Sequence, residues 1–270
     1  MAKKPVVLVV MDGIGYSKSG IGDAVSEART PTLDKLLKNY PNTSLKAHGD
    51  AVGLPSDDDM GNSEVGHNAL GCGQIYAQGA KLVNESIASG KMFSSETWNE
   101  IVGNCVANGS TLHFMGLLSD GNVHSNIEHL KIMIAKAKEQ GVKKVRAHVL
   151  LDGRDVPATS GLIYVVDLEA SMASLNDDTF DAKIASGGGR MTITMDRYQA
   201  DWNMVKMGWD THVKGIGRQF ANTTDAVNTY RKELEVIDQD LPAFVIAENG
   251  EPVGKIVDND SVILFNFRGD

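Results

Sequence analysis

Residues 111–151 have the sequence TLHFMGLLSDGNVHSNIEHLKIMIAKAKEQGVKKVRAHVLL. The apolar runs Thr111–Leu118 and Val145–Leu151 predict two strands. Between them, Ile127–Gln140 predicts a helix that ends at the glycine Gly141. A strand, a polar loop, a helix and a second strand in succession are typical of two parallel strands joined by a helical crossover. This stretch therefore favours an α/β fold, with a mostly parallel sheet flanked by helices.

The same alternation of strands and helices extends to both sides of this stretch. Further strands are expected at Pro5–Met11, Leu45–His48, Ala182–Ala185 and Ser261–Phe267, and further helices at Thr32–Lys38, Ser160–Ser174 and Asp225–Glu235. Pro5–Met11 follows two lysines, but it is short, ends at Asp12 and lacks a small-residue cleavage site. A buried parallel strand is therefore favoured over a signal sequence.

Composition excludes several classes of partner. The 270 residues are 42% hydrophobic and carry a formal charge of −9, from 26 Lys+Arg against 35 Asp+Glu. No block of basic residues interrupts this balance, so nucleic acid and anionic membrane surfaces are not expected partners. No stretch approaches the roughly 20 apolar residues of a membrane span. Cys72 and Cys105 give no disulfide framework and no metal spacing, which favours packing roles in a reducing cytoplasm.

The loops that follow the predicted strands carry the residues suited to chemistry. In a parallel sheet these loops meet at one edge, where ligands bind. They hold Asp120, His124 and Ser125; Asp152, Arg154 and Asp155; Gly187–Gly189 with Arg190; and Arg268 with Asp270, while Arg197 follows the third loop closely. Arginine grips carboxylate or phosphate with two prongs, and consecutive glycines let backbone N–H groups approach an anion. We infer a small substrate with more than one negative group.

Each of these loops also has a plainer interpretation. Arg154 lies between two aspartates and could form a surface salt-bridge cluster, the three glycines could be a flexible turn, and His124 could be a hydrogen-bonded loop residue. The tripeptide Arg268–Asp270 matches an integrin-binding motif, which we attribute to chance in a cytoplasmic α/β chain. The functional interpretation depends on four loops at equivalent positions all suiting an anion.

A separate candidate is the serine in the stretch Asp59–Asn68, whose sequence is DMGNSEVGHN. Ser63 stands where a loop is predicted to become a short helix that continues through Leu70. A hydroxyl at a helix start lies beside unpaired backbone N–H groups and the positive end of the helix dipole, which favour an alkoxide and attract phosphate. The alternative is that Ser63 is simply the N-cap.

Asp12 closes the first predicted strand, beside Gly13 and Gly15. An aspartate there can cap a turn, or it can bind a divalent metal whose charge helps to ionise a serine. Asp12 and Ser63 together therefore suggest a metal-activated nucleophile for phosphoryl transfer.

Several ordered segments carry a family resemblance that runs over essentially the whole chain. They are Val10–Gly13, His48–Gly49, Val52–Pro55, Met60–His67, Leu118–Ser125, Asp152–Asp155, Ser186–Arg190 and Phe265–Arg268. Together they resemble the cofactor-independent, or 2,3-bisphosphoglycerate-independent, phosphoglycerate mutases of the alkaline-phosphatase superfamily. The resemblance implies an isomerase that interconverts 3-phosphoglycerate and 2-phosphoglycerate in glycolysis and gluconeogenesis through a phosphoserine intermediate.

The resemblance also implies a role for each candidate residue. Ser63 would be the nucleophile, and Asp155 a candidate acid/base for the glycerate hydroxyl. The substrate would be held by His124, Arg154, Asp155, Arg190, Arg197 and Arg268. Asp12 and Ser63 would share a divalent metal ion, Mn²⁺ being expected, as part of a two-metal site, and no 2,3-bisphosphoglycerate would be needed.

In domain terms, the resemblance assigns residues 1–77 to the amino-terminal part of the metal-binding phosphatase domain. Residues 78–270 would be the substrate-binding phosphotransferase domain inserted into it, without its carboxyl-terminal part. The remaining metal ligands would belong to a carboxyl half beyond Asp270, so we expect an amino-terminal half that is inactive alone. The complete enzyme would be a cytoplasmic monomer.

Three alternatives remain at this point. Another enzyme of the superfamily, such as a phosphatase, sulfatase or phosphopentomutase, would share the nucleophile segment, although the arginine-rich loops disfavour a plain phosphatase. A non-catalytic, Rossmann-like anion-binding module would need the arginines but not Ser63. A structural or adhesive protein would use the terminal Arg-Gly-Asp.

Overall fold

The computed structural model describes residues 4–269 except residues 12, 16 and 18, and it divides into two compact units, residues 1–45 and 46–270. The first unit contains α1 (Ala24–Glu27) and α2 (Pro31–Asn39). The helix predicted at Thr32–Lys38 is therefore confirmed. Pro31 begins α2 because its fixed φ suits the first helical position, and Thr30 precedes it as the N-cap.

The strands predicted at Pro5–Met11 and Leu45–His48 are wrong. Pro5–Met11 has no regular secondary structure, and its side chains lie open to solvent, with Val6 95% exposed. Strand propensity alone does not make a strand, because the backbone groups need a neighbouring strand to pair with. Among the described residues of the first unit there is no such strand.

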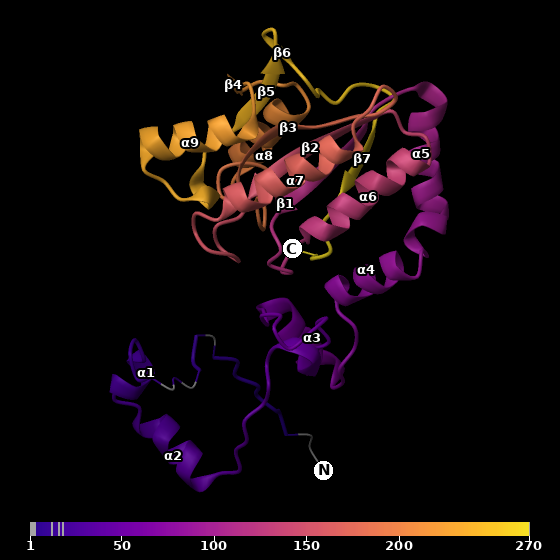
Figure 1. The fold of residues 1–270 in the computed structure, drawn as a ribbon. Coiled ribbons are helices and arrows are strands. Elements are labelled where there is room, and N and C mark those ends of the chain that lie inside the picture. The colour runs from indigo at the N-terminus through magenta and orange to yellow at the C-terminus, as the bar shows by residue number, and fades with distance from the viewer. Residues whose placement is uncertain (1–3, 12, 16, 18, 270) are drawn as a thin grey trace. The chain divides into compact units, whose positions relative to one another are not determined.

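The second unit is built on a sheet of seven strands. These are β1 (Leu112–Leu118), β2 (Lys144–Leu151), β3 (Asp181–Gly189), β4 (Arg218–Phe220), β5 (Phe244–Glu248), β6 (Glu251–Pro252) and β7 (Ser261–Leu264). The order is β4-β5-β3-β2-β1-β7, and β6 pairs with β5 (Figure 1). Strands β7, β1, β2 and β3 are parallel to one another, and β4 is parallel to β5, whereas β5 runs antiparallel to β3. The predicted α/β class with a mostly parallel sheet is confirmed.

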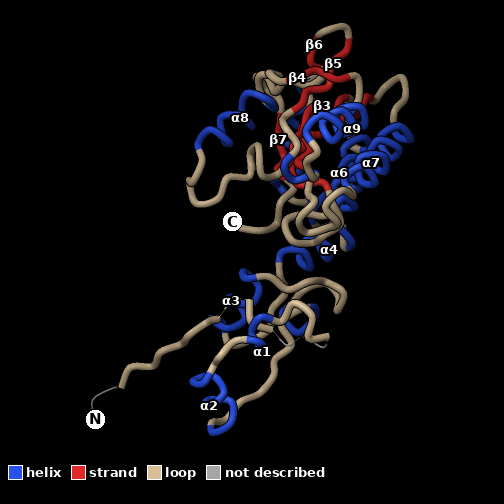
Figure 2. The backbone as a smooth tube through the Cα atoms, turned by 90° about the vertical axis from the view of Figure 1, so that its left-hand side faces the viewer, coloured by secondary structure: helices blue, strands red, loops and turns tan. Residues whose placement is uncertain are grey.

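Helices flank this sheet on both sides. They are α5 (Glu96–Asn108), α6 (Ile127–Glu139), α7 (Gly161–Leu175), α8 (Trp202–His212) and α9 (Thr223–Leu234), and two further helices of this unit, α3 (Ser63–Cys72) and α4 (Gly79–Ala88), precede them in the chain. Figure 2 shows α8 on one side of the sheet and α6, α7 and α9 on the other. The three helices predicted at 127–140, 160–174 and 225–235 are confirmed, and α4, α5 and α8 are additions that the sequence analysis did not predict.

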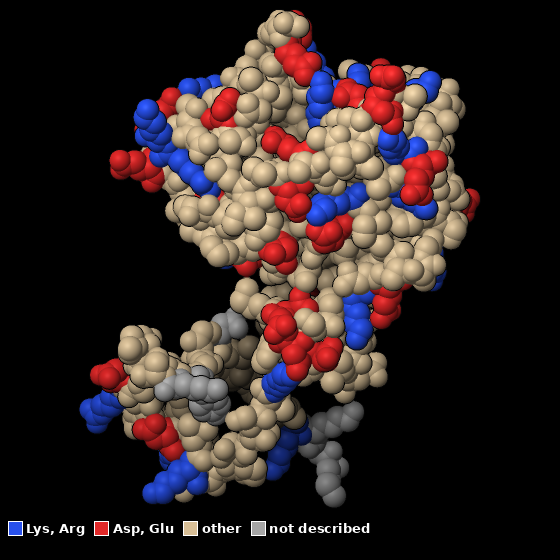
Figure 3. All heavy atoms as spheres, in the orientation of Figure 1, with Lys and Arg blue, Asp and Glu red and all other residues tan. Residues whose placement is uncertain are grey.

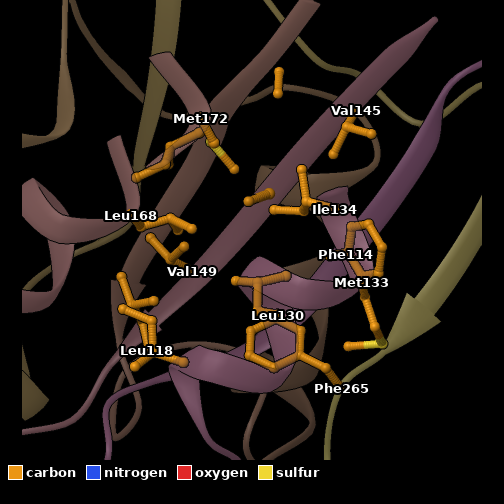
Figure 4. Packing of buried hydrophobic residues seen from close by; sticks show 14 of the residues in the cluster. Phe114, Leu118, Leu130, Met133, Ile134, Val145, Val149, Leu168, Met172 and Phe265 are labelled. Atoms are coloured by element: carbon orange, nitrogen blue, oxygen red, sulfur yellow. The ribbon is translucent and has the colours of Figure 1, made fainter. Parts of the chain in front are cut away.

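The main core lies between the sheet and helices α5, α6 and α7. Alternate residues of β1 face it, and Phe114 packs among side chains of α6 such as Leu130 and Ile134 (Figure 4). Phe114 and Leu130 are completely buried. The intervening residues of β1 face the opposite side of the sheet, where Leu117 packs with Leu150 and Ile193. One face of the sheet is therefore covered by the main apolar core, and the opposite face carries this small apolar cluster.

The glycine loop predicted after β3 is part of the strand. β3 continues through Gly189, beyond the predicted end at Ala185. A Cβ on Gly187 would lie 2.5 Å from the Val149 carbonyl oxygen, and one on Gly189 would lie 2.2 Å from that of Gln239. The N–H of Gly189 donates to Leu241 O at 2.8 Å. These glycines permit close backbone packing, so the prediction of an anion-binding glycine loop is wrong.

The two cysteines lie in different surroundings. Cys105 is buried, as predicted for a packing residue, but Cys72 is exposed at the end of α3, so its predicted packing role is wrong.

Within the ranges 4–11, 13–15, 17 and 19–269, no helix has the length and apolar character to cross a membrane. Figure 3 shows lysines, arginines and acidic residues interspersed over one face, as expected for a chain without a basic block.

Candidate active site

A cleft of about 680 Å³ lies in the second unit, where the loops after β1, β2, β3 and β7 meet. Its lining includes Ser63, His124, Arg154, Asp155, Arg190, Arg197 and Arg268. These are all the sequence-predicted site residues except Asp12. The parallel strands explain the convergence, because their carboxyl ends share one edge of the sheet.

Asp152 organises the turn after β2 from a fully buried position. Its Oδ1 accepts hydrogen bonds from the N–H groups of Arg154 (3.1 Å) and Asp155 (3.0 Å), as well as from Nη1 of Arg190 (2.8 Å). Its Oδ2 accepts from the Ser119 hydroxyl at 2.7 Å. The carboxylate thereby fixes the backbone that carries Arg154 and Asp155. The sequence signal for this role is an aspartate directly after a strand, because such a side chain often accepts from the N–H groups two and three residues further on.

Arg190 forms the buried cationic part of the cleft. It follows β3 directly, and its side chain is 8% exposed. Nη1 donates to both Asp152 and Asp155. A buried arginine needs such partners, because an unpaired charge away from water is costly. Asp155 is consequently held at the cleft wall beside a guanidinium.

Arg154, in contrast, is exposed at the cleft, and its Nη1 lies 3.9 Å from the Met191 sulfur. Among the described residues it has no ion pair, since the neighbouring aspartates contact Arg190 instead. The alternative that Arg154 belongs to a surface salt-bridge cluster is therefore wrong. Its guanidinium is placed to meet an anion in the cleft.

His124 and Arg268 connect the loop after β1 to the segment after β7. His124 is 3% exposed, and its carbonyl oxygen accepts from the N–H of Phe267 at 2.9 Å. Nε of Arg268 lies 3.4 Å from a carboxylate oxygen of Glu64 on α3. These contacts join the sheet edge to the helix that begins at Ser63.

Ser63 is the first residue of α3 and not its N-cap. The cap is Asn62, which has an extended backbone and accepts from the N–H of Val65 at 3.2 Å. The N-cap interpretation of Ser63 is therefore wrong, because the preceding asparagine supplies the capping oxygen. Ser63 is exposed, and within the described part of the chain its hydroxyl makes no hydrogen bond. This position leaves the hydroxyl available at the helix start.

The segment before Ser63 is fixed by close packing. A Cβ on Gly61 would lie 1.9 Å from the Ala47 carbonyl oxygen, so only glycine fits there. Asp59 accepts from the amide of Asn122 at 2.6 Å, and Asn122 in turn accepts from Asn126 at 2.7 Å. The serine segment is thus tied to the loop after β1.

The metal ion expected at Asp12 and Ser63 involves only one of the described residues, Ser63. Asp12 itself lies outside them. In the described ranges, no group of three or more His, Cys, Asp or Glu side chains is placed to hold a metal ion. Ser63 alone is not a full ligand set for a divalent metal ion, so the metal at Asp12 and Ser63 stays a prediction.

The fold and the cleft define an α/β protein that gathers several arginines and a serine at a helix start in one cleft, an arrangement that suits a small anionic ligand. Comparison with known proteins makes this class specific. The family model described as BPG-independent PGAM N-terminus (iPGM_N) matches residues 83–270. The chain belongs to the family of 2,3-bisphosphoglycerate-independent phosphoglycerate mutases, which confirms the resemblance seen in the sequence.

Individual relatives agree with this assignment. A probable 2,3-bisphosphoglycerate-independent phosphoglycerate mutase of Leptospira interrogans serovar Lai is 55% identical over 270 residues, 99% of this chain and 49% of the relative. The mutase of Trypanosoma brucei brucei is 47% identical over 273 residues, 100% of this chain and 50% of the relative. A crystal structure of Leishmania mexicana phosphoglycerate mutase at low cobalt concentration matches with a TM-score of 0.92 and 46% identity, over 97% of this chain and 48% of that chain. The chain thus spans about half the length of the curated relatives it matches.

Proposed function

We propose that the protein to which these residues belong interconverts 3-phosphoglycerate and 2-phosphoglycerate in glycolysis and gluconeogenesis. The observation that carries this proposal is the cleft, because it gathers Ser63 and four arginines at the edge of one sheet. Four guanidinium groups suit a ligand with a phosphate and a carboxylate. The family membership supports the same substrate.

The proposed reaction uses Ser63 as the nucleophile. Its oxygen bonds to phosphorus as its proton is released to solvent, and the bond from phosphorus to the 3-hydroxyl oxygen breaks. Asp155, first protonated from solvent, gives that proton to the leaving oxygen, which leaves phosphoserine and bound glycerate. After the glycerate reorients, its 2-hydroxyl attacks the phosphoserine while Asp155 takes the proton. The serine–phosphorus bond then breaks and Ser63 is reprotonated.

The remaining proposed site residues hold the glycerate between the two transfers. Arg154 is exposed, whereas Arg190 is buried and paired with two carboxylates. One exposed and one buried arginine at the same cleft suit a ligand that must reorient without leaving. Arg197, Arg268 and His124 complete the lining of the cleft.

We further propose a divalent metal requirement, with Mn²⁺ expected, to which Asp12 and Ser63 would contribute. A divalent cation supplies positive charge that favours the ionised serine. The Leishmania relative crystallised at low cobalt concentration supports a metal-dependent family enzyme. The family is independent of 2,3-bisphosphoglycerate, and we propose a cytoplasmic monomer whose phosphatase domain includes residues 1–77 and whose transferase domain includes residues 78–270.

The test is a chimera in which residues 1–270 replace the matched half of the Leptospira mutase. With 3-phosphoglycerate and Mn²⁺, the chimera is expected to form 2-phosphoglycerate, measured by coupling to enolase. Ser63→Ala is expected to abolish both turnover and the phosphoserine detected by intact mass. Free phosphate as the main product would contradict the mutase proposal and indicate a phosphatase instead. The 270-residue chain alone is expected to bind 3-phosphoglycerate without turning it over.

A further inference from the structure

The second face of the sheet, opposite the apolar core, contains a continuous chain of buried polar side chains. It runs through Asp260, His113 on β1, His148 on β2, Ser186 on β3, His212 on α8 and Thr194 in the loop after β3. The five successive distances are 3.1 Å (Asp260 to His113), 2.9 Å (His113 to His148), 2.7 Å (His148 to Ser186), 2.8 Å (Ser186 to His212) and 3.0 Å (His212 to Thr194). The chain therefore crosses three adjacent strands and reaches α8.

The members on the strands and on α8 are almost fully buried. His113 and His148 are 0% exposed, His212 is 1% and Ser186 is 2%. Strand register explains part of the alignment, because His148 and Ser186 are paired residues of β2 and β3. Buried polar groups are stable only when hydrogen-bonded, and this chain pairs every ring nitrogen of the three histidines.

With the three histidines neutral, one direction of donation satisfies the whole chain. The Asp260 carboxylate can only accept, so His113 donates from Nε2 and accepts at Nδ1. His148 then donates from Nε2 to His113 and accepts the Ser186 proton at Nδ1. Ser186 accepts from Nδ1 of His212, whose Nε2 is left to accept the Thr194 hydroxyl. Burial lowers the pKa of each of the three histidines and so favours these neutral rings, each in a defined tautomer.

The two ends of the chain lie in different surroundings. At one end, Asp260 also accepts from the N–H groups of Thr111 and Val257, at 2.8 and 2.9 Å, and is thereby fixed to the sheet. At the other end, Thr194 lines the cleft three residues before Arg197. Nε2 of His212 thus accepts a hydrogen bond from Thr194 in the loop after β3, and the other end of the chain is fixed to the sheet at Asp260.

The backbone at Thr194 needs such support. Its φ is +68°, an unfavourable value for a β-branched residue, and Tyr198 and Gln199 in the same loop also have positive φ. The backbone of α8 approaches closely, since a Cβ on Gly208 would lie 2.3 Å from the Thr194 hydroxyl oxygen. A strained loop persists where its surroundings hold it, and His212 supplies one of those contacts.

We propose that His212 is a positioning residue that holds Thr194, and with it the loop 190–201 bearing Arg197, at the cleft. The inference rests on the proposed function. Its consequence is that affinity for phosphoglycerate depends on the hydrogen-bonded chain that ends at Asp260. His212 does not itself line the cleft and acts through Thr194.

The neutral state of the chain makes this support sensitive to acid. Burial lowers the pKa of His212 to about 4, and it also lowers the pKa values of His113 and His148. Arg146 and Lys144 on β2 add to this effect at His113, while Asp260 opposes it. A proton on Nε2 of His212 would remove the acceptor that holds the Thr194 hydroxyl.

The test compares Thr194→Val, which removes the hydroxyl and keeps the shape, with Thr194→Ser, which keeps the hydroxyl. Hydrogen exchange of the 270-residue chain at pH 7 is expected to be at least tenfold faster at residues 191–200 in the valine variant. The serine variant is expected to stay within threefold of the parent chain. Met172→Ala is the control, because this residue packs in the main core on the other face and lowers global stability without touching the loop. Unchanged exchange in Thr194→Val, or equal acceleration in Met172→Ala, would overturn the inference.

A second readout uses 3-phosphoglycerate binding, measured by calorimetry on the same chains. Thr194→Val and His212→Asn are expected to weaken binding at least fivefold, and Thr194→Ser less than twofold. Unchanged affinity in the first two variants, with the parent chain binding, would contradict the inference. If the parent chain binds no 3-phosphoglycerate, the proposed ligand site is wrong, and the exchange experiment alone decides the positioning role.

Discussion

The segments Val6–Met11 and Val145–Leu151 have similar composition but different structures. Both are short runs rich in valine and leucine. Val6 and Val9 are 95% and 71% exposed, whereas Val145 and Val149 are fully buried in β2. β2 pairs with β1 and β3 on either side, while the first segment has no strand partner within the described residues. The valine-rich first segment has the higher strand propensity, yet only the second is a strand, so backbone pairing decides the outcome.

The largest expected change in the free energy of unfolding comes from removing a side chain of the core, and it sharpens this comparison. Phe114→Ala in β1 is expected to lower the free energy of unfolding by about 3–5 kcal/mol, because it leaves a cavity against α6. Val7→Ala is expected to change it by less than about 0.5 kcal/mol, because Val7 is 81% exposed. Urea unfolding of both variants measures the difference. A large cost at Val7 would show that its segment is buried in solution.

Acid is expected to affect the second unit selectively, since the first histidine of the chain is His48. The pKa of His212 falls from 6.5 when unfolded to about 4 when folded. The unfolded state therefore binds the proton first, so stability is complete above pH 6.5 and is lost as pH falls towards 4. This single group accounts for a loss of about 3 kcal/mol. The parent chain should show this slope in urea titrations between pH 7 and 4.

The control for this pH effect is His212→Gln, which lacks the titrating ring. Its stability should fall less steeply over the same range, and the remaining slope should come from His113 and His148, whose pKa values are lowered by burial as well. An identical slope in parent and variant would show that His212 is not buried as described.

A smaller effect is expected at Asp152. Asp152→Asn keeps the shape but removes the charge that faces Arg190, which retains Asp155 as a partner. We expect a loss of about 1–3 kcal/mol, the range for a charged hydrogen bond. Asp34→Asn on exposed α2 is the matched variant in the first unit and should be neutral within about 0.5 kcal/mol. Equal effects at the two positions would contradict the anchoring role of Asp152.

The smallest predicted change in stability is at Arg154, where the change in ligand binding is the informative one. Arg154→Ala should leave the urea midpoint unchanged, because the side chain is exposed and has no ion pair among the described residues. Binding of 3-phosphoglycerate should weaken about tenfold or more, since one charged contact is lost. An unaltered affinity by calorimetry would remove Arg154 from the site.

Much of the sheet could be predicted from sequence, because β1, α6 and β2 follow from local periodicities. The end of β3 could not, since glycines disfavour a strand and are required there only by contacts with Val149 and Gln239. The helix α8 was missed, and its exposed tryptophans, such as Trp202, obscure an amphipathic pattern. Pro5–Met11 was predicted wrongly because pairing is not a local property.

The cleft residues were predictable for a topological reason, because equivalent loops of parallel strands meet at one edge. What sequence could not show is which partner each residue takes. Asp152 binds Arg190 across 38 positions of sequence, and His148 meets Ser186 across the same interval. These pairings depend on how strands far apart in the sequence align with one another, which the local pattern of each strand does not show by itself.

The central claim is that the loops at the carboxyl edge of the sheet and Ser63 form one phosphoglycerate site. The most direct measurement is a crystal structure of the 270-residue chain with 3-phosphoglycerate. We predict ligand in the cleft, with its phosphate and carboxylate within hydrogen-bond distance of Arg154, Arg190 and Arg268. Ligand bound elsewhere, or a cleft without ligand at saturating concentration, would contradict the account.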